Sequence, residues 1–114
     1  MNSLVKKPWG SYEILKQEDN FLVKILIINP GGKLSLQSHE HRSEYWTVVS
    51  GNALITINEN IMELKTNKSI FIPEKAKHRI ENVKDKQLKI IEVQYGNILK
   101  EDDIIRYEDI YNRK

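Results

Sequence analysis

The sequence contains no cysteine among its 114 residues. Disulfide bonds and thiolate metal sites are therefore excluded, and any bound metal must be held by nitrogen and oxygen ligands. Long hydrophobic runs are absent too. No stretch approaches the roughly 20 apolar residues of a membrane span, and the N-terminal segment MNSLVKKPWG lacks the apolar core of a signal peptide. We therefore expect a soluble, cytoplasmic protein with no membrane partner.

A strong net charge is also lacking. The 18 Lys and Arg residues nearly balance the 16 Asp and Glu residues, which gives a net charge of +2, and the two signs are mixed along the chain. Nucleic-acid-binding surfaces are usually strongly basic, so we expect no nucleic-acid partner. The length fits one domain, residues 1–114, with one site.

Short apolar or alternating runs, separated by turn residues, fill the chain from Tyr12 to Tyr95. They are rich in Val, Ile, Leu, Thr and aromatic residues, which favour strands, and Gly, Asn and Pro lie between them. The expected strands lie in SYEILK, FLVKILIIN, KLSLQSHEH, EYWTVVS, NALITIN, IMELKT, SIFIP, KHRIEN and QLKIIEVQY. Pro73 should end its strand or mark an edge.

The tail EDDIIRYEDIYNRK differs from the rest, because its apolar residues are spaced to cover one stripe of a helix. These residues are Ile104, Ile105, Tyr107, Ile110 and Tyr111. Together, the patterns predict an all-β antiparallel barrel followed by a short C-terminal helical segment.

Two histidines and a glutamate lie close together in SLQSHEHRSEYW, residues 35–46. Side chains i and i+2 of a strand share one face and lie about 6–7 Å apart, so His39 and His41 could converge on one ion, with Gln37 pointing the same way. Glu44 breaks this alternation. The chain must therefore turn or bulge between His41 and Glu44 before the carboxylate can face the histidines.

The third histidine, His78, lies in IPEKAKHRIEN near the start of a late strand. One interpretation is that all three histidines are simply exposed on the surface. The HxHxxE spacing, together with a distant histidine that follows a proline, favours a metal site instead. The predicted ligands are His39, His41, Glu44 and His78. Three imidazoles and a carboxylate suit one divalent ion, with Zn as the first candidate and Mn, Fe, Co or Ni as alternatives.

The two histidine segments resemble the two sequence motifs of cupins. SHEHRSEYWTVVSG resembles the first motif, and IPEKAKHRIEN resembles the second, with His78 and Asn82 at the expected positions. Four longer segments extend the similarity to the type II phosphomannose isomerase family over nearly the whole chain: KPWGSYEIL, NPGGKLSLQSHEHRSEYWTVVSGNA, FIPEKAKHRIEN and IEVQYGNILKEDDIIRYEDIY. The resemblance implies a double-stranded β-helix, or jelly-roll barrel. Lys75 departs from it, because the second motif usually has glycine there.

In many members of that family, this domain follows a mannose-1-phosphate guanylyltransferase. The glycine-rich nucleotide-binding loop of that enzyme is missing here, so the resemblance implies a free-standing isomerase. It would interconvert mannose 6-phosphate and fructose 6-phosphate for activated-mannose and polysaccharide synthesis, with a small-molecule sugar phosphate as its substrate. A separate guanylyltransferase chain could be a partner. Exposed strand edges in an open barrel also predict a homodimer.

An aldose–ketose isomerase also needs a base that is not committed to the metal. Glu92 interrupts LKIIEVQY and Lys24 interrupts FLVKILII. If those faces line the barrel, Glu92 is the candidate base, and Lys24 is a second candidate catalytic residue that could bind sugar oxygens or phosphate. The alternative is that both side chains face solvent or pair with each other, because the sequence alone does not show which face of each strand points inward.

Two arginines flank the expected ligands, and guanidinium groups suit phosphate oxygens geometrically. Arg42 and Arg79 are therefore candidate substrate-binding residues, with Gln37 as a third. Strict alternation turns Arg79 away from the face that His78 uses, which favours a structural ion pair for Arg79 over phosphate contact. Large aromatics in a small barrel usually belong to the core. Trp9, Tyr45 and Trp46 could also wall a sugar pocket, but we expect them in the core and name none of them as a site residue.

Two other functions stay open. The chain could be an isomerase or epimerase that acts on a nucleotide-linked or other phosphorylated sugar. It could also be a non-catalytic cupin that binds a sugar or supports a guanylyltransferase chain. The fold cannot separate these functions, because cupins host many chemistries.

Overall fold

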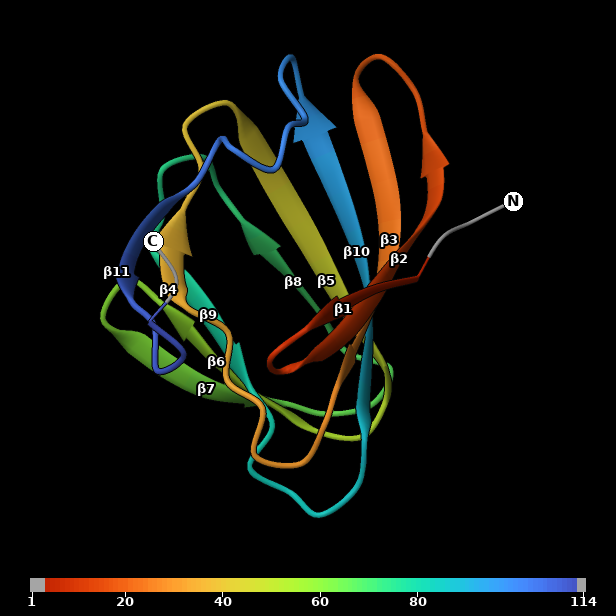
Figure 1. The fold of residues 1–114 in the computed structure, drawn as a ribbon, viewed down its shortest axis with the longest axis vertical. Coiled ribbons are helices and arrows are strands. Elements are labelled where there is room, and N and C mark those ends of the chain that lie inside the picture. Colours follow the sequence, from red (N-terminus) through yellow and green to blue (C-terminus); the bar gives the residue numbers. More distant parts are fainter. Residues whose placement is uncertain (1–3, 113–114) are drawn as a thin grey trace.

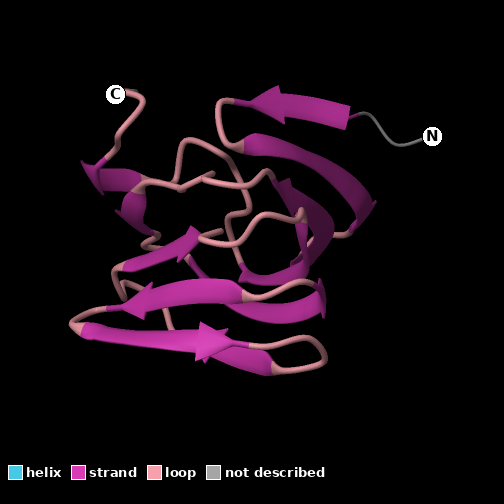
Figure 2. Cartoon of the chain, turned by 90° about the horizontal axis from the view of Figure 1, so that it is seen from below, coloured by secondary structure: helices cyan, strands magenta, loops and turns pink. Residues whose placement is uncertain are grey.

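The computed structural model describes residues 4–112, and these residues form strands and loops without any helix (Figure 2). No helix able to cross a membrane is therefore found in this part of the chain. The strands are β1 (Leu4–Lys7), β2 (Gly10–Gln17), β3 (Phe21–Ile28), β4 (Leu36–Ser38), β5 (Arg42–Ser50), β6 (Ala53–Ile57), β7 (Asn60–Leu64), β8 (Ser69–Ile72), β9 (His78–Glu81), β10 (Leu88–Gly96) and β11 (Ile105–Glu108). The all-β prediction is confirmed.

The strands form two antiparallel sheets that face each other (Figure 1). One sheet has six strands in the order β1-β2-β3-β10-β5-β8, and the other has five in the order β11-β4-β9-β6-β7. β10 pairs with β3 on one side and with β5 on the other, so segments far apart in the sequence meet in the middle of the larger sheet. Side chains from the two inner faces fill the space between the sheets.

The inner face of the larger sheet changes character along its strands. In β3 every second residue is buried: Leu26 and Ile28 join the hydrophobic core, whereas Lys24 occupies an equivalent inward position. β10 repeats the pattern, with Ile90 in the core and Glu92 further along the same face. Full burial of an Ile or Leu side chain contributes about 1.5–3 kcal/mol. The apolar end therefore supports a polar end, which is where the candidate site lies.

Each run expected as a strand overlaps one of β2 to β10, and β1 is an additional strand that pairs with β2. Pro73 follows directly after β8, which is an edge strand of the larger sheet. The prediction that Pro73 ends its strand or marks an edge is confirmed.

The expected C-terminal helix is wrong for residues 101–112, and residues 113–114 lie outside the described residues. β11 pairs antiparallel with β4, with Ile105 opposite Ser38 and Arg106 opposite Gln37 (Figure 1). Arg106 is half-buried between two exposed neighbours, which is the two-residue period of a strand. The unpaired edge of β4 offers hydrogen-bonding groups to this segment, and such tertiary pairing overrides a weak helical pattern.

Candidate metal centre

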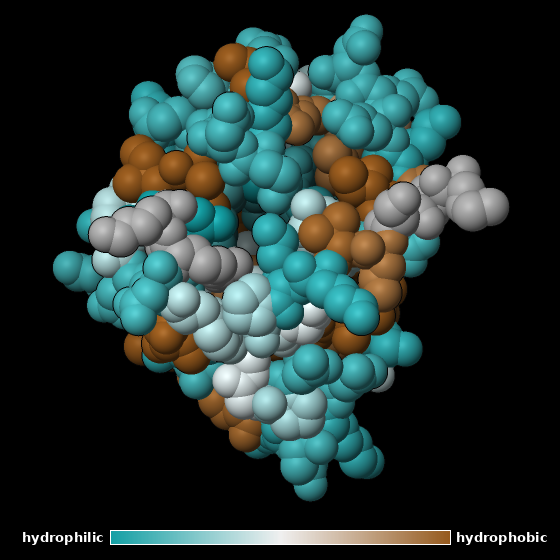
Figure 3. All heavy atoms as spheres, viewed as in Figure 1, coloured by the Kyte–Doolittle hydropathy of each residue, from teal (hydrophilic) through white to brown (hydrophobic). Residues whose placement is uncertain are grey.

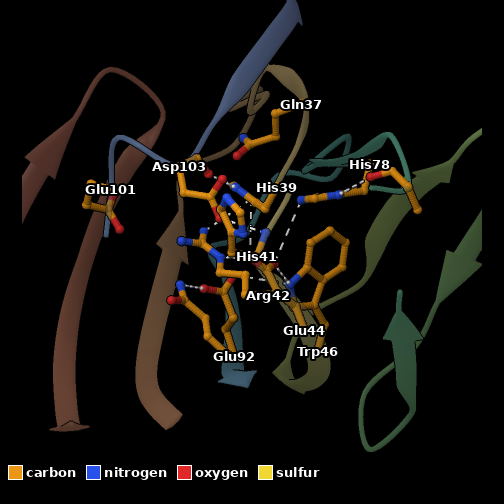
Figure 4. A network of polar contacts seen from close by, with 12 residues as sticks. Gln37, His39, His41, Arg42, Glu44, Trp46, His78, Glu92, Glu101 and Asp103 are labelled. Atoms are coloured by element: carbon orange, nitrogen blue, oxygen red, sulfur yellow. Dashed lines mark hydrogen bonds and ion pairs between the residues drawn. The ribbon is translucent and has the colours of Figure 1, made fainter. Parts of the chain in front are cut away.

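Three buried side chains converge between the two sheets (Figure 4). His39 lies in the turn after β4, Glu44 lies in β5, and His78 begins β9. Their ligand-type atoms all lie within 4.8 Å of one another. The Glu44 carboxylate is central, with Oε2 at 3.3 Å from Nε2 of His39 and Oε1 at 3.8 Å from Nε2 of His78. One carboxylate and two imidazole nitrogens form a donor set that suits a divalent transition metal.

In both imidazole rings, Nδ1 contacts a main-chain carbonyl oxygen. Nδ1 of His39 lies 2.6 Å from the carbonyl oxygen of Asp103, and Nδ1 of His78 lies 2.9 Å from that of Ala76. A carbonyl oxygen can only accept a hydrogen bond, so Nδ1 carries the proton in both rings and the lone pair of Nε2 faces Glu44. Metal-binding histidines are typically oriented in this way. The residues therefore fit a metal ion.

The electrostatics of His39 favour its neutral form. Burial lowers the pKa of His39 to about 4, and the positive charges of Arg42 and His78 act in the same direction. A metal ligand must be unprotonated, so this imidazole is available to a cation at neutral pH.

Arg42 reaches into the same cluster from the start of β5. Its Nε donates to Oε2 of Glu44 at 2.9 Å, and its guanidinium lies 3.1 Å from Nε2 of His39. Burial works to raise the pKa of Glu44, but its electrostatic interactions with His78 and Arg42 outweigh burial and lower that pKa. Glu44 is therefore held as a carboxylate. The predicted phosphate-binding arginine thus lies within hydrogen-bonding distance of two of the candidate ligands.

His41 lies apart from this group. β4 ends at Ser38, so the strand alternation that would place His39 and His41 on one face does not continue through the turn. The His39 side chain is buried, whereas His41 is exposed and donates its main-chain N–H to Oδ2 of Asp103. The turn predicted between His41 and Glu44 is replaced by one at residues 39–41, immediately before β5. The structure thus brings together three of the four predicted ligands.

Lys24 and Glu92 both face the cavity, so the alternative that they face solvent is wrong. They are direct cross-strand partners on β3 and β10, but the ammonium of Lys24 pairs with Glu101 rather than with Glu92. The Glu92 carboxylate accepts from Nε1 of Trp46 at 3.1 Å and from Nε2 of Gln94 at 2.7 Å. Burial raises the pKa of Glu92, and the nearby charge of Glu44 acts in the same direction.

Trp46 connects Glu44, one of the three candidate metal ligands, to Glu92. Its single indole N–H lies 3.0 Å from Oε1 of Glu44 and 3.1 Å from Oε1 of Glu92. Sequence reasoning assigned Trp46 and Trp9 to the core, and both are buried there, but both also line the cavity. Tyr45 is exposed and packs against Phe71 outside the barrel, contrary to its expected place in the core.

The remaining candidates also line this cavity, which holds about 600 Å³ of empty space when the open solvent at its mouth is included. Gln37 donates to Oγ of Ser35 at 3.1 Å. Arg79 donates to Oε1 of Glu108 and to the carbonyl oxygen of Leu34, each at 2.9 Å. Arg79 therefore forms the expected ion pair, but it also lines the cavity together with His78, although strict alternation would have turned it away.

Sequence reasoning missed the segment between β10 and β11. The Asp103 carboxylate accepts from the main-chain N–H groups of Glu40 and His41, while its carbonyl orients His39. Glu101 extends from the same segment toward Lys24. Both residues were assigned to a helix, and the two-residue alternation in IIRYE was the signal that could have indicated otherwise.

Lys75 occupies the position where the cupin motif usually has glycine. Its backbone adopts the left-handed conformation, with φ of 69°, and its N–H donates to the carbonyl oxygen of His39 at 2.8 Å. The turn before His78 therefore forms with lysine in a conformation that favours glycine.

Comparison with known proteins supports the resemblance seen in the motifs. Residues 1–109 match the family model described as mannose-6-phosphate isomerase C-terminal. The alginate biosynthesis protein AlgA of Pseudomonas putida is 49% identical over 109 residues, which cover 96% of this chain and 22% of AlgA. The mannose-1-phosphate guanylyltransferase ManC of Salmonella typhimurium is 43% identical over 113 residues, which cover 99% of this chain and 24% of ManC. The chain thus spans less than a quarter of the length of these relatives.

Solved structures show the same fold. CapF, a capsular polysaccharide assembling protein of Staphylococcus aureus, superposes with a TM-score of 0.80 at 22% identity, covering 96% of this chain and 33% of CapF. An RmlC-like cupin from Shewanella frigidimarina gives a TM-score of 0.77 at 16% identity, covering 90% of this chain and 88% of that cupin. The barrel is therefore a cupin barrel. Its sequence match over residues 1–109 shows that the chain belongs to the mannose-6-phosphate isomerase C-terminal family, as the motifs indicated.

Proposed function

We propose that this chain is a metal-dependent isomerase that interconverts mannose 6-phosphate and fructose 6-phosphate. The observation that carries the proposal is the position of Glu92, a buried carboxylate that faces the same cavity as His39, Glu44 and His78 but lies outside their cluster. An aldose–ketose isomerase needs a cation site and a separate base, and this cavity offers residues for both.

His39, Glu44 and His78 would hold one divalent ion, with Zn as the first candidate and Mn, Fe, Co or Ni as alternatives. When bound, the ion would act as a Lewis acid that polarises the sugar oxygens. Gln37, Arg42 and Arg79 line the same cavity and are proposed to contact the substrate.

Glu92 would move the proton between the two reacting carbons. Its carboxylate takes the proton from C2 of open-chain mannose 6-phosphate, the C–H electron pair forms the C1=C2 double bond, and the carbonyl π electrons move to O1. A proton then passes from O2 to O1, and Glu92 returns its proton to C1 as the carbonyl forms at C2. No atom is gained or lost. A raised pKa brings a carboxyl group closer to the pH at which general bases work well, and the Trp46 and Gln94 donors hold Glu92 in place.

The relatives indicate a setting for this reaction. Their names refer to alginate biosynthesis, xanthan biosynthesis and mannose-1-phosphate guanylyltransferase. We propose that the chain serves activated-mannose synthesis for polysaccharides in the cytoplasm, with a separate guanylyltransferase chain as a partner. The expected homodimer stays a prediction, which light scattering coupled to size-exclusion chromatography would test.

A coupled assay with mannose 6-phosphate tests the function directly. Protein reloaded with a divalent metal should form fructose 6-phosphate, and chelator-treated protein should not. The Glu44→Gln variant should lose bound metal and turnover together. If metal-loaded wild-type protein is inactive on mannose 6-phosphate but binds a sugar nucleotide or a guanylyltransferase chain, one of the alternative functions replaces this proposal.

A further inference from the structure

Lys24 is a buried cation whose counter-charge is exposed. The Lys24 side chain is 5% exposed, and its Nζ lies 3.1 Å from Oε2 of Glu101, whose side chain is 58% exposed. Nζ also lies 4.0 Å from the centroid of the Tyr12 ring. A buried ammonium without a partner is costly, whereas an ion pair with an exposed carboxylate is weak. Because the Glu101 side chain is exposed, its contact with Lys24 is open to exchange for another anion.

The segment that carries Glu101 is attached to the cavity at other points. Asp103, two residues further on, accepts from two N–H groups of the turn at residues 39–41 and orients His39. The carbonyl oxygen of Lys100 lies 3.4 Å from the guanidinium of Arg42. Contacts made by Lys100 and Asp103, on either side of Glu101, thus hold this segment beside the cavity (Figure 4), and the Glu101 side chain takes no part in them.

We propose that Glu101 is a specificity-determining residue that occupies the anion position beside Lys24 until the phosphate group of a substrate replaces it. The inference rests on the proposed function only for the identity of that substrate. A neutral hydroxyl group cannot provide the charge that Lys24 loses when Glu101 leaves. A phosphate can, because it carries up to two negative charges and three acceptor oxygens. A phosphate can therefore take the place of Glu101 beside Lys24, whereas a neutral hydroxyl group cannot.

On the face of the molecule in Figure 3, hydrophilic residues predominate and the hydrophobic patches are separated. The cavity lining combines the positive charges of Lys24 and three arginines (Arg42, Arg79 and Arg106) with the negative charges of Glu44, Glu92 and Glu101. Removal of the Glu101 charge would end its competition for Lys24 and its repulsion of an incoming anion.

Binding of inorganic phosphate, measured by isothermal titration calorimetry, tests the proposal. Metal-free protein is used so that phosphate cannot bind through an ion. Glu101→Gln should bind phosphate about twofold to fivefold more tightly than wild type, the factor that corresponds to an exposed ion pair. Asp102→Asn is the matched control, because Asp102 is the exposed neighbour and loses the same charge. It should bind phosphate like wild type.

A second pair of variants assigns the effect to Lys24. In a Lys24→Met background, the added Glu101→Gln change should leave phosphate affinity unaltered. Unchanged or weaker binding by Glu101→Gln, an equal gain in Asp102→Asn, or no phosphate binding by either Glu101→Gln or wild type would overturn the proposal. The measurement requires no turnover, so a failure of the isomerase assay would be a separate result.

Discussion

Replacement of Glu92 by Gln should remove most of the turnover while leaving the protein folded and able to bind metal. The structure indicates why the fold should tolerate the change. The amide oxygen of the new side chain can still accept from Trp46, as Glu92 Oε1 does at 3.1 Å. Its NH₂ group needs an acceptor, and Oε1 of Gln94 has no hydrogen-bond partner among the described residues. If the side-chain amide of Gln94 rotates, its Oε1 can accept a hydrogen bond from the new NH₂ group at position 92.

The expected loss can be worked out from the role of the residue. General acid–base catalysis by one positioned side chain contributes about 10²–10⁴-fold, which corresponds to about 3–5 kcal/mol of transition-state stabilisation. The free energy of unfolding should change by less than about 1 kcal/mol, because both hydrogen bonds of Glu92 can be retained and a neutral amide replaces a buried carboxyl group.

Three measurements distinguish a loss of catalysis from a loss of metal or of stability. The coupled assay gives kcat, elemental analysis gives the metal content, and thermal melting gives the stability of Glu92→Gln beside wild type. Glu44→Gln is the contrasting variant, since it should lose metal as well as activity. Undiminished turnover in Glu92→Gln would refute the assignment of the base and leave Lys24 as the next candidate. A loss of metal in Glu92→Gln would refute the independence of base and cation site.

Three further predictions concern the cation site and its surroundings. His39→Ala should lower the bound metal measured by elemental analysis more than His41→Ala does, because only the first ring lies in the buried cluster, and equal losses would contradict this. Chelator-treated protein should keep a cooperative thermal transition, because none of the three candidate ligands belongs to the apolar core around Ile28 and Ile55, and a non-cooperative melt would make the metal structural. Lys75→Gly should raise stability by about 0.5–1 kcal/mol in denaturant titrations, because glycine adopts a φ of 69° without steric penalty, and a decrease would show that the lysine is not strained.

The sequence predicted most strands correctly because their two-residue alternation is a local property. The same alternation could not decide whether Lys24 and Glu92 face inward, since a pattern within one strand does not reveal which face meets the other sheet. The register supplies that information: Lys24 lies directly opposite Glu92, in the same inward rows as Leu26 and Ile90.

The errors share a physical cause, which is that tertiary contacts decided the outcome. His39 and His41 follow one spacing in the sequence, but β4 ends before them, and Asp103 binds the turn from a segment more than 60 residues away. β11 likewise depends on the free edge of β4, which its own residues do not encode. Long-range partners of this kind leave only a weak trace in local periodicity.

The position of Trp46 has an optical consequence. Its buried indole donates to two carboxylates and lies edge-on to His78, with ring centroids 5.3 Å apart. Indole emission responds to nearby charge and to contact with a protonated imidazole, so a cation that reaches Glu44 and His78 would alter the fluorescence of Trp46. The chain has one other tryptophan, Trp9, which lines the same cavity. A Trp9→Phe background would leave Trp46 as a built-in spectroscopic probe of the cavity, with no label attached.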